Sequence, residues 1–153
     1  MKHLDSIDKD ILRFVQIDSA ISNADLAEKV GLSASACLGR TKNLRKKGVI
    51  KRYTAVIDEQ KVGLSIISFT FVTLSPHNRT AAEAFCEQIQ NLSQVVECYN
   101  ITGNWDYLIK IVSPTIEAYR DFIMDSLLTI PAVNKVETLM VLKSEKQNGA
   151  LPF

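Results

Sequence analysis

Cysteine and histidine are scarce in this chain of 153 residues. The three cysteines, Cys37, Cys86 and Cys98, are odd in number and far apart, and they form no CxxC pair. This pattern argues against a disulfide framework or a zinc site. We expect each cysteine to be a small core residue in the reducing environment of a cytoplasm. The two histidines, His3 and His77, leave little material for histidine-based catalysis.

Long apolar runs are also missing. No stretch approaches the roughly 18–20 apolar residues that a membrane span needs, and the start of the chain, from Met1 to Asp5, becomes polar at once, unlike a signal peptide. The composition, 46% hydrophobic and 23% charged, is typical of a globular protein. We therefore expect one ordinary domain or two small ones, without membrane association.

Acidic residues are absent from one long stretch. None occurs between Glu28 and Asp58, although the whole chain carries 18 basic and 17 acidic residues. A ligand responds to the local field rather than to the net charge, so the stretch indicates a surface for a polyanion. An ordinary solvated helix face is the alternative interpretation. The eight basic residues of the stretch are Lys29, Arg40, Lys42, Arg45, Lys46, Lys47, Lys51 and Arg52.

The first part of the chain has helical periodicity. Apolar residues recur every three or four positions over residues 4–15, which predicts a first helix. Ser22 and Ser33 are suited to cap two more helices, and Gly31 and Gly48 are suited to end them. Because a very short turn separates the last two helices, they must cross steeply, as in a helix-turn-helix.

The pattern then changes. Residues 49–57 are rich in β-branched and aromatic side chains, which predicts a short strand or wing, and a polar break follows. We predict a helix-turn-helix domain over residues 1–52, a hinge strand or linker over 53–63, and a second domain over 64–153.

The second domain alternates strands and helices. Strands are predicted over 66–74, 95–102, 107–112 and 133–143. The order βαββαβ is that of a ferredoxin-like unit, so the fold class is α+β, with a winged helix-turn-helix domain first. The residues expected to face inward from the two intervening helices are Ala82, Phe85, Ile89 and Leu92, and then Ile116, Tyr119, Ile123 and Leu127.

The third helix carries the predicted chemistry. With 100° per residue, Cys37, Thr41 and Leu44 form its core stripe, and the opposite surface has small residues, an amide and cations but no acid. This surface fits a DNA major groove, because small side chains allow close approach, arginine and asparagine can pair with base edges, and lysine neutralises phosphate. The predicted DNA contacts are Ser33, Ser35, Ala36, Gly39, Arg40, Lys42, Asn43, Lys46, Lys47 and Arg52.

Gly39 is unusual in a helix interior, where it costs about 1 kcal/mol relative to alanine. Either the backbone approaches DNA closely there, or the residue has simply drifted at an exposed position. Arg45 lies beside the core stripe, where its stem is expected to pack, and it is not among the predicted contacts.

Several segments resemble the Lrp/AsnC (feast/famine) family of transcriptional regulators over nearly the whole chain. Residues 21–33 (ISNADLAEKVGLS), 37–40 (CLGR) and 48–55 (GVIKRYTA) resemble the helix-turn-helix of the family. Residues 103–107 (GNWDY) and 127–133 (LLTIPAV) resemble two motifs of its RAM domain. The likeness is nearer to the leucine-responsive branch.

This resemblance implies a cytoplasmic, nucleoid-associated regulator of amino-acid metabolism that binds double-stranded DNA. It also implies homodimers joined through the second domain and assembled into an octamer, with an amino-acid effector between dimers. Two third helices of a dimer would then enter successive major grooves about 34 Å apart. No metal or other cofactor is expected.

The turn over residues 103–106 is the predicted polar part of the effector site. Its backbone N–H groups and the Asp106 carboxylate could bind an α-amino acid, whereas the residues alone favour an ordinary tight hairpin. Leucine or methionine is the expected effector, because the further candidates are apolar. The predicted effector contacts are Gly103, Asn104, Trp105, Asp106, Ile116, Leu139, Met140 and Val141.

The chain departs from the family pattern at three positions. Asn104 replaces the first aspartate of the loop, which affects the expected effector. Gly39 stands where a longer side chain is usual and Thr41 where valine is usual, which affects the expected operator sequence.

Two other functions remain open from the sequence. Ferredoxin-like domains also host small enzymes, but the sequence has no nucleophile–base motif, metal-ligand cluster or phosphate loop, so we expect no catalysis. An amino-acid sensor acting on a protein partner is the other possibility, and the acid-free stretch argues against it.

Overall fold

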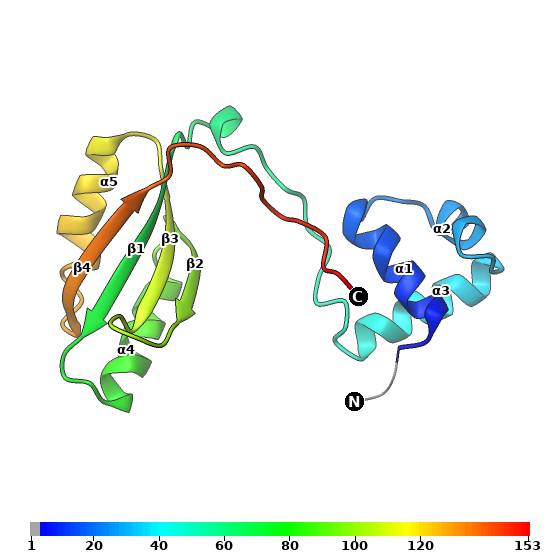
Figure 1. Cartoon of the computed structure of the whole chain (residues 1–153), viewed down its shortest axis with the longest axis horizontal. Coiled ribbons are helices and arrows are strands. Elements are labelled where there is room, and N and C mark those ends of the chain that lie inside the picture. The colour runs from blue at the N-terminus through cyan, green and yellow to red at the C-terminus, as the bar shows by residue number, and fades with distance from the viewer. Residues whose placement is uncertain (1–3) are drawn as a thin grey trace. The chain divides into compact units, whose positions relative to one another are not determined.

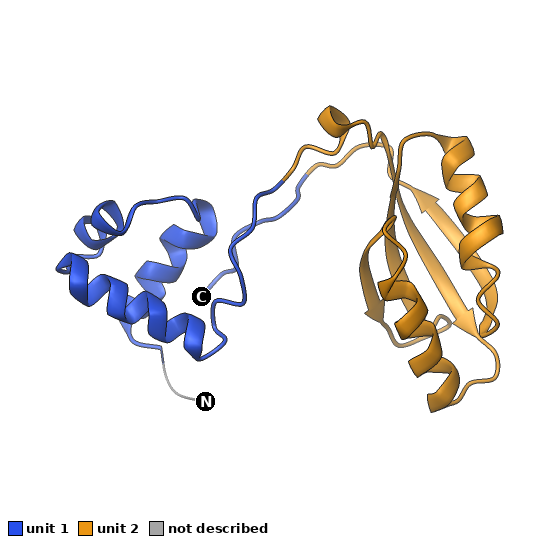
Figure 2. Cartoon of the chain, turned by 180° about the vertical axis from the view of Figure 1, so that it is seen from behind, with its two compact units in different colours: residues 1–56, 146–153 blue, residues 57–145 orange. Residues whose placement is uncertain are grey.

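The computed structural model of the chain describes residues 4–153. Met1, Lys2 and His3, on which the prediction about the start of the chain depends, lie outside the described residues. The chain divides into two compact units (Figure 2): residues up to Val56 together with Lys146–Phe153, and residues Ile57–Glu145. The sequence-based division had assigned the last eight residues to the second domain.

The first unit contains the three helices α1 (Ser6–Ile17), α2 (Asn23–Lys29) and α3 (Ala34–Lys46). Their N-caps are Asp5, Ser22 and Ser33, and each cap side chain accepts a hydrogen bond from the backbone N–H three residues later. Such bonds satisfy donors that the first turn of a helix leaves unpaired. The predicted caps at both serines are confirmed.

The connection between α2 and α3 is tight. Gly31 has a φ of 68°, a conformation that costs glycine little. The backbone N–H of Leu32 donates to the Ala27 carbonyl at 2.9 Å, and the Asn23 side-chain amide donates to the Ala34 carbonyl at 2.8 Å. These bonds fix the start of α3 against α2, which is the predicted helix-turn-helix arrangement.

The core of the first unit forms where the three helices meet. Ile11 and Cys37 are fully buried, and Leu26 and Leu44 are nearly so. Thr41, also placed on the core stripe, is half-buried, and its hydroxyl donates to the Cys37 carbonyl at 2.9 Å. The core side of α3 is therefore the one predicted.

The strand predicted over residues 49–57 is not formed. Ile50 packs into the core of the first unit, but the described chain has no strand in this segment. Tyr53, Val56 and Ile57 are exposed. The strand alternative of the prediction is wrong, because β-propensity makes a strand only where a neighbouring strand pairs with it. The wing or linker alternative stays a prediction.

The second unit is a four-stranded sheet with helices packed on one face (Figure 1). After a 3-10 turn, η1 (Gln60–Val62), its strands and helices follow in the predicted order, and the sheet order β2-β3-β1-β4 is antiparallel throughout. The prediction of a ferredoxin-like unit is confirmed. The elements are β1 (Ile66–Leu74), α4 (Arg79–Gln90), β2 (Val95–Asn100), β3 (Tyr107–Ser113), α5 (Ile116–Phe122), its π-helical continuation η2 (Ile123–Leu127), and β4 (Val133–Met140).

The core of the second unit lies between the sheet and α4, α5 and η2. Phe85, Ile109 and Leu127 are fully buried there. Two predicted inward residues are not inside: Ile116 is 61% exposed, because it occupies the first turn of α5, and Cys98 is exposed on the edge strand β2. Over residues 4–153, no helix is long and apolar enough to cross a membrane.

Candidate nucleic-acid interface and effector site

The outer surface of α3 is open to solvent as the helical pattern predicted. Lys42, Asn43 and Lys46 are exposed, so they are not packed inside the protomer. Among residues 4–153, no acidic side chain forms an ion pair with either lysine. The other predicted DNA contacts that are exposed to solvent are Ser33, Ser35, Ala36, Gly39, Lys47 and Arg52.

The start of α3 combines a capping serine with a second hydroxyl. The Ser33 Oγ accepts from the Ala36 N–H at 3.3 Å and lies 3.2 Å from the Ser35 Oγ. A helix N-terminus attracts anions through its unpaired N–H groups and its dipole. This end of α3 is therefore chemically suited to a phosphate.

Gly39 lies on the exposed surface of α3 with room around it. A Cβ built at this position would meet no heavy atom within 4 Å. No packing within the described protein therefore requires glycine there. Packing in the folded unit does not explain why the chain accepts the cost of glycine in helix propensity.

Arg40 differs from the other cations of α3. Its Nη1 donates to the Asp5 Oδ2 at 2.7 Å and to the Asp8 Oδ1 at 2.8 Å, so the side chain joins α3 to the start of α1. The pKa of Asp5 is lowered, first by its hydrogen bond from the Asp8 N–H and then by Arg40. Bonding to both carboxylates raises the pKa of Arg40.

Sequence analysis missed these two aspartates. The acid-free stretch was defined along the chain, whereas Asp5 and Asp8 come from another helix. Their spacing of three residues, which places two carboxylates at neighbouring positions of one helix, was the available signal. Arg45, which was not predicted to contact DNA, lies with its guanidinium carbon 5.4 Å from the centre of the Tyr53 ring.

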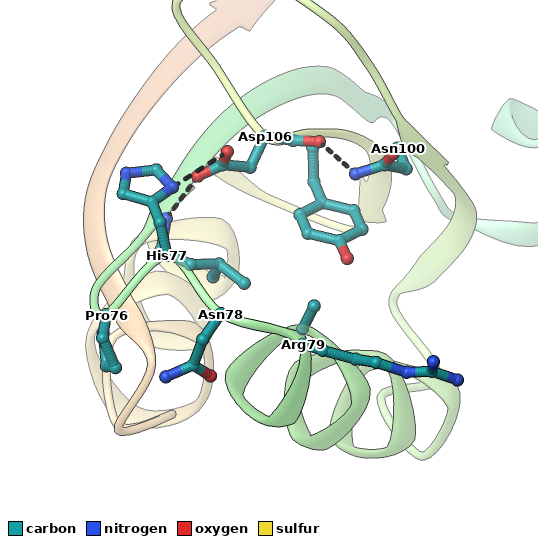
Figure 3. A pocket seen from close by; sticks show the side chains of 9 residues that line it. Pro76, His77, Asn78, Arg79, Asn100 and Asp106 are labelled. Atoms are coloured by element: carbon teal, nitrogen blue, oxygen red, sulfur yellow. Dashed lines mark hydrogen bonds and ion pairs between the residues drawn. The ribbon is translucent and has the colours of Figure 1, made fainter.

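The turn between β2 and β3 holds the predicted polar part of the effector site. Gly103 has a φ of 119°, as the hairpin interpretation required. The Asp106 carboxylate accepts from the Leu74 N–H at 2.7 Å and lies 3.4 Å from the His77 Nδ1 (Figure 3). The carboxylate therefore ties the turn to the end of β1, a partner that sequence spacing did not reveal.

Trp105, in the same turn, packs on the sheet. Its ring lies 5.7 Å from the Phe71 ring, and the Lys135 ammonium lies 4.7 Å from the indole centre. Phe71 and Lys135 belong to the sheet face opposite the helices, because their neighbours Val72 and Val136 pack into the core. This residue thus covers one end of that open face.

A cavity of about 310 Å³ lies beside Asp106. Tyr107 forms part of its wall and is 5% exposed. Burial, followed by its hydrogen bond with Cys86, raises the pKa of Tyr107 to about 12. The nine lining residues are drawn in Figure 3: Leu74, Pro76, His77, Asn78, Arg79, Ala82, Asn100, Asp106 and Tyr107.

The predicted effector residues do not form one site within the protomer. Asp106 bonds to Leu74 at the end of β1, whereas Met140 pairs with Ser68 near its start. Six residues of strand separate these points by about 20 Å. Leu139 is 54% exposed, and it points to the sheet face opposite that of Met140, because successive side chains alternate. The remaining apolar candidates, Ile116 and Val141, also lie toward the start of β1.

Both units match known family models. Residues 4–51 match a winged helix-turn-helix DNA-binding domain, and residues 67–151 match the Lrp/AsnC ligand binding domain. The transcriptional regulator AzlB of Bacillus subtilis is 47% identical over 98% of this chain and 96% of its own. The leucine-responsive regulatory protein of Escherichia coli is 37% identical over 98% and 92%.

Solved structures agree. A transcriptional regulator of Neisseria meningitidis in complex with L-Met has a TM-score of 0.93 and 31% identity, with 98% of this chain and 97% of that chain covered. An AsnC family regulator of Agrobacterium tumefaciens has a TM-score of 0.91 and 34% identity, with 97% of each chain covered. These relatives are regulators rather than enzymes, in agreement with the predicted lack of catalysis. The chain therefore belongs to the Lrp/AsnC family of DNA-binding transcriptional regulators.

Proposed function

We propose that this regulator binds specific operators through the outer surface of α3 and that an amino acid, leucine or methionine, controls its assembly. The observation that carries the proposal is the exposed α3 surface, on which Lys42, Asn43 and Lys46 lie together without an acidic partner among the described residues. In this arrangement Lys42, Lys46, Lys47 and Arg52 contact phosphates, and Ser33 binds one at the helix start.

Base recognition falls to the groups nearest the centre of this surface. Asn43 can make two hydrogen bonds to an adenine edge, and Ser35 can donate to or accept from a base. Ala36 and Gly39 allow the helix to approach the groove closely. The proposed regulator acts on genes of amino-acid metabolism in the cytoplasm, in association with the nucleoid.

The effector proposal needs more than one copy of the chain. The polar turn (Gly103, Asn104, Trp105 and Asp106) and the apolar candidates lie at opposite ends of the sheet in each protomer, so we propose that one copy supplies the turn and another supplies Ile116, Leu139, Met140 and Val141. The L-Met complex of the Neisseria relative supports an amino acid as ligand, and apolar side chains suit leucine or methionine.

The open sheet face supports a dimer. Its side chains include Phe69 and Phe71, which are half-buried, and Leu139 and Tyr99, which are about half-exposed. An apolar sheet face of this kind is normally covered, and a second copy joined sheet to sheet would cover it. We propose that such dimers assemble into an octamer, so that an effector bound between dimers changes the spacing of the α3 helices. Such coupling is typically worth about 1–3 kcal/mol.

The direct test is titration of genomic DNA fragments at two salt concentrations. Specific binding should weaken steeply as salt rises, because phosphate contacts release counterions. A folded sample that binds every fragment equally, or none, would contradict operator recognition. Isothermal titration with the twenty amino acids tests the effector separately, and light scattering with and without the ligand found measures the assembly.

A further inference from the structure

Asp5 and Asp8 hold a cation of α3 at the start of α1. The Arg40 Nη1 lies 2.7 Å from one carboxylate and 2.8 Å from the other. The Arg40 side chain is 34% exposed, and that of Asp8 only 13%. The contact with Asp8 is thus partly removed from water, whereas the Asp5 side chain is 51% exposed, and single exposed ion pairs contribute little.

This arrangement sets Arg40 apart from its neighbours on the same helix. Two carboxylates against one guanidinium leave a local charge of −1 at this flank of α3. Lys42 and Lys46, by contrast, have no ion-pair partner in the part of the chain that the structure describes. The lysines are therefore available to a polyanion, whereas the arginine is already neutralised within the protein.

We propose that Asp5 and Asp8 restrain Arg40 and so limit sequence-independent binding of this unit to DNA. The inference rests on the proposed function of α3. A guanidinium is a strong phosphate ligand, and phosphate contacts supply most of the affinity for unrelated DNA. Because an excess of unrelated sites competes with any operator in a genome, withholding one such contact leaves more protein free to find its operator.

The test removes one restraining charge without removing the helix cap. Asparagine caps helices as well as aspartate does, so Asp5→Asn keeps an acceptor for the Asp8 N–H but frees Arg40 from one carboxylate. Asp10→Asn is the matched control, since Asp10 lies on the same helix and pairs instead with Arg13 at 2.7 Å. Both variants change the net charge by the same amount.

We expect Asp5→Asn to bind an unrelated duplex more tightly than Asp10→Asn, with a steeper dependence on salt. One additional phosphate contact adds about 0.9 to the slope of log K against log salt. A fourfold fall in salt should therefore strengthen binding of Asp5→Asn by up to about 3.5-fold more than that of the control. The double variant Asp5→Asn/Arg40→Ala should lose this gain, and circular dichroism confirms folding of each variant.

The possible results separate the restraint from the proposed function. Equal slopes for Asp5→Asn and Asp10→Asn would overturn the inference, and so would a gain that persists without Arg40. If the unchanged protein binds neither operator fragments nor unrelated DNA, the proposed function fails as well. A purely structural role of the ion pair would lower the melting temperature without changing the salt slope, which also counts against the restraint.

Discussion

The two units present their chemistry in different ways. In the first unit one helix carries most of the proposed DNA contacts, so a periodic pattern along its 13 residues was enough to predict which of its side chains are exposed. In the second unit the candidate ligand residues are distributed over a turn and a strand end at opposite ends of the sheet. A surface on one element can therefore be predicted from local sequence, whereas a site assembled from several elements or several copies cannot.

The largest expected effect comes from core substitutions, which test whether the two units unfold independently. Phe85 is fully buried and its ring lies 4.6 Å from the Tyr107 ring, so Phe85→Ala should destabilise the second unit by about 3–5 kcal/mol. Trp105 is the only tryptophan of the chain, and its fluorescence in urea follows that unit alone. Leu44→Ala is the matching change in the first unit. It should cause part of the helical ellipticity to be lost at a lower urea concentration, without changing the urea concentration of the Trp105 transition. Equal shifts of both signals in either variant would show that the units unfold together.

The next effect tests whether Asp106 is structural. Asp106→Ala leaves the Leu74 N–H without its acceptor, which should cost the second unit about 1–3 kcal/mol. Asp106→Asn, which keeps an acceptor, should cost less. Urea unfolding of both variants, followed by Trp105 fluorescence, measures the difference. If the alanine variant is as stable as the unchanged protein, the carboxylate has no role in holding the turn to β1.

The fold was largely predictable, because most of its helices and strands are specified by local sequence signals. Ser22 and Ser33 capped their helices as expected, and the strand at residues 66–74 was found to the residue, because capping and short-range apolar patterns are local. The strand predicted over residues 49–57 is not formed, since strand formation depends on a partner strand that the local sequence does not supply. Asp106 was found as a candidate, but its bond to Leu74, 32 residues away in the chain, was not.

A smaller effect concerns the exposed lysines of α3. Lys42→Ala/Lys46→Ala should weaken binding to operator fragments about tenfold or more and reduce the salt slope by about two, because two phosphate contacts are lost. Lys61→Ala/Lys143→Ala, in the second unit, removes the same charge from residues outside the proposed interface. Equal losses in the two double variants, measured by fluorescence anisotropy, would mean that only net charge matters.

Gly39 provides a test in which stability and affinity should move in opposite directions. Because a Cβ there meets nothing within 4 Å, Gly39→Ala should stabilise the first unit by about 0.5–1 kcal/mol. The added methyl group should nevertheless weaken operator binding if the backbone approaches the groove closely. A thermal melt and a DNA titration on one preparation decide between this role and neutral drift, since drift predicts higher stability with unchanged affinity.

The smallest effect is a pH dependence at the start of α1. The lowered pKa of Asp5 means that its carboxylate stabilises the folded state above its ordinary pKa of 3.8. This contribution disappears as pH falls through the lower folded pKa. The difference in melting temperature between the unchanged protein and Asp5→Asn should therefore be largest near neutral pH and shrink below pH 3.8. A difference that grows toward acid pH would contradict the assignment.

The last eight residues give the chain an unexpected topology. The Leu151 N–H donates to the Gln16 side chain at 2.9 Å, and the Arg13 guanidinium donates to the Phe153 carbonyl at 2.9 Å, so residues 146–153 belong to the unit that carries α3. In connectivity, the ligand-binding unit is an insertion within the DNA-binding unit, attached at two junctions rather than one. A fragment cut at Val56 would lack part of its own unit, and a synthetic peptide of residues 146–153 is the piece needed to restore it.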